Sequence, residues 1–379
     1  MQIIYVSNSR IPTEKAHGLQ IMKMCEVFSN HAHVKLLLPT RRNNSEFKNL
    51  DPFKYYSTSS KFSIKKILTP DPWLLYKYKI SSGLYIKIQA SFFILSLFFY
   101  FIFNKSQKSI LYTRDEHLLP ILQIFSKKVI WEAHTLPNNY QPYLRYWKKC
   151  PKIICISQSL KNSLIKWGID KNKILVAHDG VDLDKFSISE SKLEIRQKLN
   201  LPTDKKIIIY AGHLYAWKGV QTLANSAKFL DSETLIIFIG GTSIDIKKFK
   251  EKNKKQPNIK ILGYQVPQKI PYYLKAADVL ILPNTSLNKK SFWTSPLKLF
   301  EYMATNKPIV ASNLPNIREI LNKNNGIFFK PNDSQDLAQK IKYILNNPQP
   351  AQTLANQARQ DVQKYIWPKR AEKIIKFIN

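Results

Sequence analysis

Short apolar segments of strand character alternate with helical patterns along this chain, and the alternation starts again after residue 186. Strands that alternate with helices form parallel sheets covered by helices on both faces. The chain has 379 residues, which exceeds the size of about 250–300 residues at which a single core stops growing. We therefore predict an α/β protein with two doubly wound domains. The predicted strands are 3–6, 34–38, 109–112, 129–132, 153–156, 174–177, 207–211, 235–239, 259–262, 279–282 and 309–311.

The boundary between the two domains is expected in the polar stretch 183–196, which carries no buried pattern. The predicted domains are residues 1–186 and 187–363. Ligands of open α/β sheets bind at the carboxyl ends of the strands. With two such sheets facing each other, we expect the active site in the crevice between the domains.

The net charge of the chain indicates which classes of binding partner to consider. The chain carries 59 Lys and Arg against 26 Asp and Glu, a formal charge of +33. Such an excess attracts polyanions, yet no RNA-recognition signature, zinc finger or basic zipper is present and no nucleic-acid partner is predicted. Attraction to an anionic membrane and compositional drift remain as two interpretations.

The N-terminus and the cysteines indicate the compartment. The first residues lack a basic n-region and are typical of a strand, so no signal peptide is predicted. The three cysteines, Cys25, Cys150 and Cys155, form no zinc or disulfide pattern. We expect a cytoplasmic protein, and the membrane interpretation of its charge would make it peripheral on the inner face of the membrane.

The stretch 90–103 contains fourteen residues without a charge, ASFFILSLFFYFIF. A bilayer span needs about 20 residues, so this stretch is too short to cross. It is either a core helix or a helix whose aromatic side enters the membrane surface.

A phosphate-binding helix start is predicted at Ser295–Ala304. Pro296 suits a first helical turn, and Thr294 or Ser295 can cap it. Lys298 and Glu301 are three residues apart and share one helix face. The first amides would bind phosphate, and the carboxylate would accept hydrogen bonds from ribose hydroxyls.

A second turn follows the predicted strand 207–211. Gly212 permits a tight turn, and Lys218 stands near the start of the next helix, where an ammonium and backbone amides can converge on one anion. A plain strand-to-helix turn with a solvated lysine is the alternative.

In their order and spacing, these motifs resemble the retaining glycosyltransferases of family 4, which have the GT-B architecture. The resemblance implies two Rossmann-like domains facing an interdomain cleft, with a C-terminal helix, 364–379, crossing back onto the acceptor-side domain 1–186. The domain 187–363 would then bind the nucleotide sugar. The segments that carry the resemblance are 11–18, 132–134, 156–157, 179–186, 212–219, 295–304 and 325–327.

On the donor side, the resemblance assigns Lys218 and the position of His213 to the diphosphate, although the family has an arginine where His213 stands. Glu301 matches the family glutamate that holds the ribose, whereas Trp293 stands where the family has its first glutamate, with seven residues between the two positions. These two departures leave open a catalytically degenerate protein that binds nucleotide sugars or a partner enzyme.

Further donor and reaction-centre residues follow from the same resemblance. Ser295 and Leu297 would offer main-chain amides, and Gly18 resembles part of the flexible first loop near the donor phosphates. His134 matches the histidine near the reaction centre and is expected, with Lys218, to be catalytic.

The acceptor side is less defined. His17, Arg114 and Asp115 are the candidate acceptor contacts. The expected reaction moves a sugar from a nucleotide-diphosphate sugar to an acceptor hydroxyl with retention, without a metal or other cofactor. Basic charge and the aromatic stretch favour a glycan or lipid-linked saccharide acceptor, as in envelope polysaccharide or lipopolysaccharide assembly.

Overall fold

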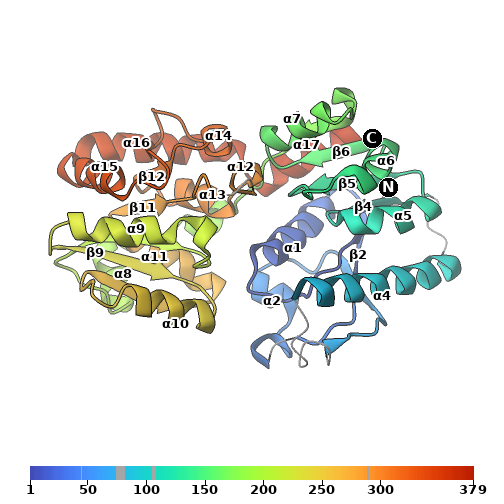
Figure 1. The fold of residues 1–379 in the computed structure, drawn as a ribbon, viewed down its shortest axis with the longest axis horizontal. Coiled ribbons are helices and arrows are strands. Elements are labelled where there is room, and N and C mark those ends of the chain that lie inside the picture. The colour runs from blue at the N-terminus through green and yellow to red at the C-terminus, as the bar shows by residue number, and fades with distance from the viewer. Residues whose placement is uncertain (44, 74–81, 105–107, 288–289) are drawn as a thin grey trace. The chain divides into compact units, whose positions relative to one another are not determined.

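The computed structural model of the protein describes residues 1–43, 45–73, 82–104, 108–287 and 290–379 (Figure 1). The chain forms two units: unit 1 comprises Met1–His178 and Trp367–Asn379, and unit 2 comprises Asp179–Ile366. Within the described residues, unit 1 contains a seven-stranded sheet and unit 2 a six-stranded sheet. Neighbouring strands run parallel in both sheets. The predicted α/β class is confirmed.

In unit 1 the strand order is β3-β2-β1-β4-β5-β6-β7. The order reverses between β1 and β4, so the carboxyl ends of these strands form the switch point where open α/β sheets bind ligands. The elements are β1 (Gln2–Val6), α1 (Ala16–Phe28), β2 (His33–Pro39), α2 (Pro52–Tyr56), β3 (Ser63–Ile67), α4 (Ser82–Phe103), β4 (Ile110–Thr113), α5 (Leu119–Phe125), β5 (Val129–Ala133), α6 (Gln141–Lys149), β6 (Lys152–Cys155), α7 (Gln158–Lys166), β7 (Ile174–Val176) and α17 (Trp367–Ile378), with 3₁₀ turns at Ser45–Phe47, Glu116–Leu118 and Lys171–Lys173.

The last helix, α17, belongs to unit 1 although unit 2 precedes it in the chain. It packs against α1 and β6 and buries Trp367, Ala371 and Ile374. The predicted return of the C-terminal helix to the first domain is confirmed, and Trp367 is an anchor of that contact.

In unit 2 the strand order is β10-β9-β8-β11-β12-β13, with the switch point between β8 and β11. The elements are α8 (Lys192–Lys198), β8 (Lys206–Ala211), α9 (Val220–Ser226), β9 (Thr234–Ile239), α10 (Ser243–Lys252), β10 (Ile259–Gly263), α11 (Ile270–Ala276), β11 (Val279–Leu282), α12 (Lys290–Trp293), α13 (Leu297–Ala304), β12 (Ile309–Ser312), α14 (Pro315–Arg318), β13 (Ile327–Phe329), α15 (Ser334–Asn346) and α16 (Pro348–Asp361), with 3₁₀ turns at Leu183–Phe186, Ala216–Lys218, Ala227–Phe229, Pro267–Lys269 and Val362–Lys364.

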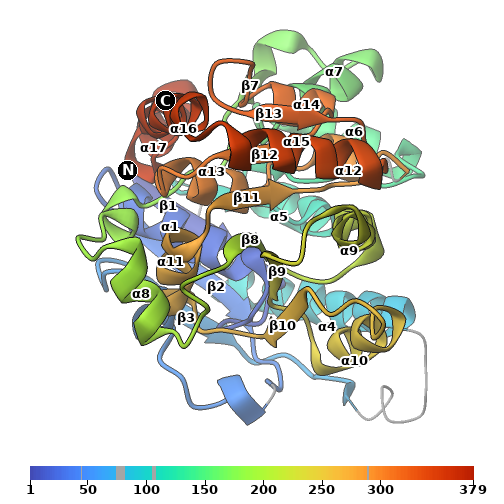
Figure 2. The same ribbon diagram turned by 90° about the vertical axis from the view of Figure 1, so that its left-hand side faces the viewer.

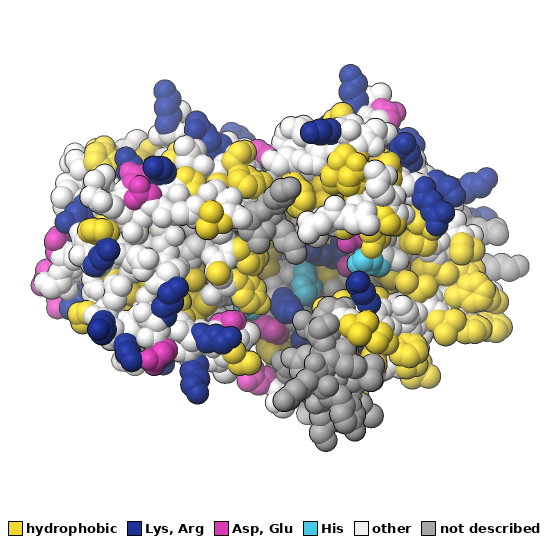
Figure 3. All heavy atoms as spheres, in the orientation of Figure 1, with side chains coloured by type: hydrophobic (Ala, Val, Ile, Leu, Met, Phe, Trp, Pro, Cys, Tyr) yellow, Lys and Arg dark blue, Asp and Glu magenta, His cyan; other side chains and the backbone are white. Residues whose placement is uncertain are grey.

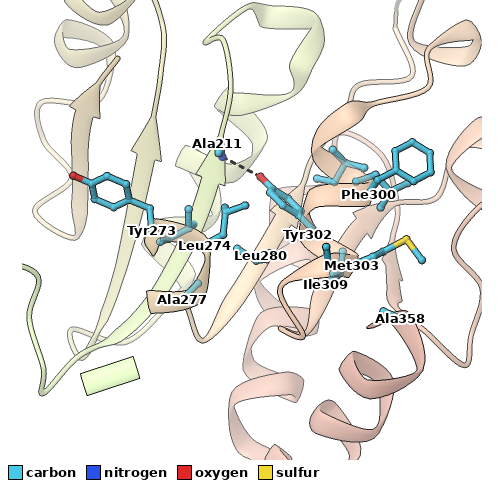
Figure 4. Close-up of a cluster of buried hydrophobic side chains, with 14 of the residues drawn as sticks. Ala211, Tyr273, Leu274, Ala277, Leu280, Phe300, Tyr302, Met303, Ile309 and Ala358 are labelled. Atoms are coloured by element: carbon cyan, nitrogen blue, oxygen red, sulfur yellow. Dashed lines mark hydrogen bonds between the residues drawn. The ribbon is translucent and has the colours of Figure 1, made fainter. Parts of the chain in front are cut away.

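Alternate residues of β8 feed two cores on opposite faces of the unit 2 sheet. Ile207 and Ile209 join the core under α8, α11, α13 and α16, whereas Ile208 and Tyr210 join the core under α9, α10 and α15. Figure 2 shows these two helix layers on either side of the strands, and Figure 4 shows the first core. Because both faces of β8 are buried, its carboxyl end has a fixed position.

The predicted linker is wrong. Residues 183–196 contain a 3₁₀ turn and most of α8, and Ile195 and Arg196 are buried in unit 2. Arg196 forms an ion pair with Asp278 at 2.7 Å. Local hydrophobicity alone indicates an exposed arginine at this position and therefore misses the pair. The units divide instead at His178 and Asp179. The edge strands β3 and β13 were also missed. Strand β3 (SIKKI) contains two lysines, and β13 (IFF) has only three residues.

Helix α4 is longer than the apolar stretch 90–103 indicated. Its segment Leu84–Phe103 is long and apolar enough to span a bilayer by length and composition alone, and 28% of it is buried. Phe93, Leu97 and Phe101 pack inward, whereas Phe99 and Phe103 are exposed. The helix therefore has a core side and an exposed aromatic side, and the prediction that its apolar part is too short to cross a bilayer is wrong. In Figure 3 hydrophobic side chains gather where Figure 1 places α4.

Candidate active site

The turn after β8 is shaped by two glycines. Gly212 follows the strand with φ +142°, and Gly219 adopts the left-handed conformation with φ +71°. A Cβ atom on Gly219 would lie 1.7 Å from the carbonyl oxygen of Pro283, which follows β11. Only glycine permits this approach. The turn is thereby held against the neighbouring strand end at the switch point of the sheet.

Helix α13 is joined to the same strand end. The hydroxyl of Tyr302, on α13, accepts a hydrogen bond of 2.9 Å from the backbone amide of Ala211 (Figure 4). The hydroxyl of Tyr210 donates to the carbonyl oxygen of His213 at 2.7 Å. The two predicted donor motifs, the turn and the helix start, therefore lie together in unit 2.

Lys298 is the group that the two motifs share. Its Nζ lies 3.8 Å from the centroid of the Tyr210 ring, and a Cβ atom on Gly212 would lie 2.5 Å from it. This nitrogen is buried and has no hydrogen-bond partner among the described residues. Burial and the positive charge of Lys218 lower the pKa of Lys298 well below its ordinary range.

Two further groups flank Lys298. Burial lowers the pKa of Lys218 to about 8, and its Nζ lies 3.8 Å from the ring centroid of Trp217. Burial raises the pKa of Glu301, an effect that the positive charge of Lys298 opposes. This set of two ammonium groups and one carboxylate is suited to a ligand that carries both a phosphate and hydroxyl groups.

The predicted capping of α13 is wrong. Pro296 occupies the N-cap position and no side chain caps the helix. The hydroxyl of Ser295 instead accepts a hydrogen bond of 3.1 Å from the amide of Asp179, and Thr294 donates to the carbonyl of Ser291. Leu297 is the first residue of the helix, so its amide is one of the donors that an α-helix leaves unpaired.

The two departures from the family pattern have defined places. The imidazole of His213 stacks on the ring of Tyr215, with centroids 4.8 Å apart and planes inclined by 6°. Trp293 is the last residue of α12. The sequence places Lys298 on the face of a helix, and the structure adds that its ammonium lies beside Gly212 in the turn after β8.

In unit 1, His134 follows β5 and contacts a carboxylate. Its Nε2 lies 2.7 Å from Oε1 of Glu132, which is fully buried. The same oxygen lies 2.8 Å from Nη2 of Arg370, on α17. The sequence singles out the segment 132–134 but not Arg370, because Glu132 and Arg370 are 238 residues apart and nothing local signals the pairing.

Two of the candidate acceptor residues, Arg114 and Asp115, directly follow the carboxyl end of β4. Arg114 donates to Gln20 at 2.8 Å. Asp115 accepts hydrogen bonds from Ser7 and from the amide of Asn8, at 2.9 and 2.7 Å, and so ties the ends of β1 and β4 together. This contact gives Asp115 a role in the fold.

His17 and Gly18 lie in the first turn of α1, so Gly18 does not belong to the flexible loop that the resemblance implies. Burial and the positive charges of Arg114 and Lys15 lower the pKa of His17 to about 3. A Cβ atom on Gly18 would lie 2.1 Å from the hydroxyl of Tyr56, so packing alone requires this glycine.

Comparisons with known proteins agree with this arrangement. The family model described as "Glycosyl transferases group 1" matches residues 191–361, and the model described as "Glycosyltransferase Family 4" matches residues 95–185. The chain belongs to this glycosyltransferase family. Both models lie within the parts of the chain that form the two parallel sheets, and likeness to solved structures confirms the predicted GT-B fold.

One such structure is HepE of Anabaena in complex with UDP-glucose, with a TM-score of 0.75 at 18% identity over 99% of this chain and 98% of that one. A galactosyltransferase of Escherichia coli, named for UDP-Gal and α-D-GlcNAc-diphosphoundecaprenol, is 30% identical over 44% of each chain. TuaC of Bacillus subtilis, a putative teichuronic acid biosynthesis glycosyltransferase, is 24% identical over 58% of this chain and 54% of its own. The chain spans between 44% and 60% of the length of such curated relatives.

Proposed function

We propose that this glycosyltransferase moves a sugar from a nucleotide-diphosphate sugar to an acceptor hydroxyl with retention of configuration, in the assembly of a bacterial envelope polysaccharide or lipopolysaccharide. The observation that carries the proposal is the meeting of Lys218, Lys298 and Glu301 at the switch point of the unit 2 sheet. The UDP-glucose complex of HepE and the polysaccharide role in the name of TuaC support the donor class and the pathway class.

Negative charge develops on the leaving diphosphate as the glycosidic bond breaks. Lys218, Lys298 and the first amides of α13 would stabilise it, and preorganised donors of this kind each contribute about 10²–10³ in rate. The departing phosphate oxygen would take the proton of the attacking hydroxyl on the same face of the sugar. Glu301 would accept hydrogen bonds from the ribose hydroxyls. The proposal requires no bound metal, so turnover should persist in EDTA.

A thermal-shift screen of nucleoside diphosphates and nucleotide sugars identifies the donor, because a ligand bound only by the folded protein raises the melting temperature. Transfer and donor hydrolysis are then measured with the donor that binds. Lys218→Ala should reduce turnover at least tenfold. The matched control is Lys228→Ala, which also removes an ammonium placed over an aromatic ring but lies outside the site. Equal turnover in both variants would contradict the role of Lys218.

Glu301→Gln should chiefly weaken donor binding, since charge-assisted hydrogen bonds to the ribose contribute roughly 1.5–3 kcal/mol. Calorimetry that gives the same donor affinity for this variant would count against the assignment. A protein that binds nucleotide sugars but neither transfers nor hydrolyses them would instead support the degenerate alternative, for which Trp293 and His213 are the sequence basis.

We further propose a lipid-linked saccharide acceptor and peripheral contact with an anionic membrane through α4. The printed name of the E. coli relative includes a diphosphoundecaprenol acceptor. Leu95, Phe99 and Ile102 expose about half of their side chains on α4. Helix α4 contacts β3 and α5. The exposed pair Lys65-Lys66 lies on β3, and the exposed pair Lys127-Lys128 follows α5.

Flotation with phosphatidylglycerol vesicles at low salt tests the membrane contact. The protein should float, and Phe99→Ser with Ile102→Ser should abolish flotation because both apolar side chains leave the interface. The control is Leu193→Ser with Ile244→Ser, which removes two exposed apolar groups from unit 2. A wild-type protein that remains at the bottom of the gradient would refute the contact.

A further inference from the structure

The carboxylate of Glu132 is the centre of a buried polar cluster in unit 1. Its Oε1 lies 2.7 Å from Gln20 Nε2, 2.7 Å from His134 Nε2 and 2.8 Å from Arg370 Nη2. The hydroxyl of Tyr112 donates to Oε2. No side-chain surface of Glu132 is exposed, so these protein groups take the place of water around both oxygens.

Glu132 is ionised in this cluster. Burial raises its pKa, but the guanidinium of Arg370 and the hydrogen bond from His134 more than offset burial and hold the pKa of Glu132 well below its usual range. An ionised carboxylate can only accept hydrogen bonds. It follows that Nε2 of His134 carries a proton and donates it to Glu132.

His134 is neutral near pH 7. Burial, with the positive charge of Arg114, lowers the pKa of His134 to about 4. A neutral imidazole carries one N–H. Because that proton is on Nε2, Nδ1 has a free lone pair and can act only as a hydrogen-bond acceptor.

Arg370 keeps this arrangement in place. Its Nε donates to the carbonyl of His178 at 2.8 Å, and its Nη2 lies 3.3 Å from the carbonyl of Ala177. These contacts fix the guanidinium from helix α17. Without its charge, burial would favour a protonated Glu132, which could donate to the imidazole and permit the other tautomer.

We propose that Glu132 and Arg370 are positioning residues, which hold His134 in the Nε2–H tautomer so that its Nδ1 accepts a hydrogen bond from a hydroxyl of a substrate bound at the carboxyl ends of the unit 1 strands. The inference rests on the proposed function for the identity of the ligand. The site is well placed for it, because His134 follows β5, next to the switch-point strand β4 in the sheet.

A role in folding alone is the competing explanation, since the pair also ties α17 to β5. The tautomer of His134 distinguishes a positioning role from a role in folding alone. Long-range ¹H–¹⁵N correlation spectra report which imidazole nitrogen carries the proton, and a His134→Gln spectrum assigns the signal among the seven histidines. The unliganded wild-type protein should show the Nε2–H pattern for His134 between pH 6 and pH 8.

Glu132→Gln should give a mixed or Nδ1–H pattern and lower kcat/KM for the nucleotide sugar about tenfold, as expected for the loss of one well-placed hydrogen bond. Arg370→Lys keeps the charge and should retain most of the Nε2–H pattern. Lys369→Gln alters the exposed neighbour on the same helix and should change neither quantity.

If Glu132→Gln fails to fold, the double variant Glu132→Gln with Arg370→Gln removes both buried charges and should fold with the tautomer mixed. A wild-type Nδ1–H pattern would overturn the inference, as would a variant that melts earlier but keeps both the tautomer and kcat/KM. A wild-type protein that shows the Nε2–H pattern but binds no nucleotide sugar would overturn the proposed function and the substrate contact with it. One that turns over the donor with Nδ1–H would overturn this inference alone.

Discussion

The hydroxyl of Tyr302 accepts the backbone amide hydrogen of Ala211 at 2.9 Å, and through this contact helix α13 fixes the end of strand β8. The amide of Ala211 is the last of the strand before the turn that carries Gly212 and Lys218. The candidate donor site therefore depends on one bond between a core side chain and the backbone.

Removing that hydroxyl should destabilise unit 2 and weaken donor binding together. Tyr302→Phe leaves a buried amide without a partner, which costs about 1–3 kcal/mol. Denaturant unfolding and calorimetry with the donor measure both effects. Tyr273→Phe is the matched control, because Tyr273 is buried in the same core and its hydroxyl makes only a long contact of 3.4 Å to Gln265. Equal losses in the two variants would contradict the prediction.

Lys298→Met should stabilise the unliganded protein while it weakens donor binding. The buried ammonium has no hydrogen-bond partner among the described residues, and its pKa is lowered by burial and by Lys218. An apolar side chain of similar length removes this cost, and we expect a gain of about 1 kcal/mol. The urea midpoint should rise, and the donor dissociation constant should increase at least tenfold. A variant that loses stability and keeps its donor affinity would exclude Lys298 from the site.

Gly219→Ala should be severely destabilising. The added Cβ meets the Pro283 oxygen at 1.7 Å, and the residue has a left-handed backbone, so we expect a loss of about 3 kcal/mol or more. Gly168→Ala is the control, since Gly168 has a similar φ of +81° with nothing closer than 3.9 Å. It should cost only about 1–2 kcal/mol for the backbone conformation. Thermal unfolding compares the two.

Donor affinity should fall as pH rises above about 8. Burial lowers the pKa of Lys218 to about 8 in the free protein, and a bound diphosphate favours the ammonium form and raises that pKa. Binding therefore takes up protons above pH 8, and affinity declines until pH reaches the pKa of the complex. Lys218→Arg stays charged and should flatten this decline. Calorimetry with a nucleoside diphosphate from pH 7 to pH 10 measures it, and a flat wild-type profile would refute the coupling.

Most central strands could be predicted because each is a continuous apolar segment buried on both faces, as in β8 and β11. The edge strands β3 and β13 could not be predicted, since their stability comes from neighbours distant in the sequence. The boundary near His178 could not be predicted for the same reason, because it depends on which distant segments pack together. In the site, the spacing of Lys298 and Glu301 and the glycines near Lys218 indicated the donor motifs. The role of Ser295 depended on Asp179, and the pairing of Glu132 depended on a helix at the other end of the chain.

That last pairing sets an order of events during synthesis. Residues up to His178 leave the ribosome with a strand that places Glu132 in the interior, but the cation that neutralises it comes from Arg370. All of unit 2 is made in between, and domains generally fold as units while the chain is translated. We therefore expect the second unit to mature first, and the earliest part of the chain to reach its native form last.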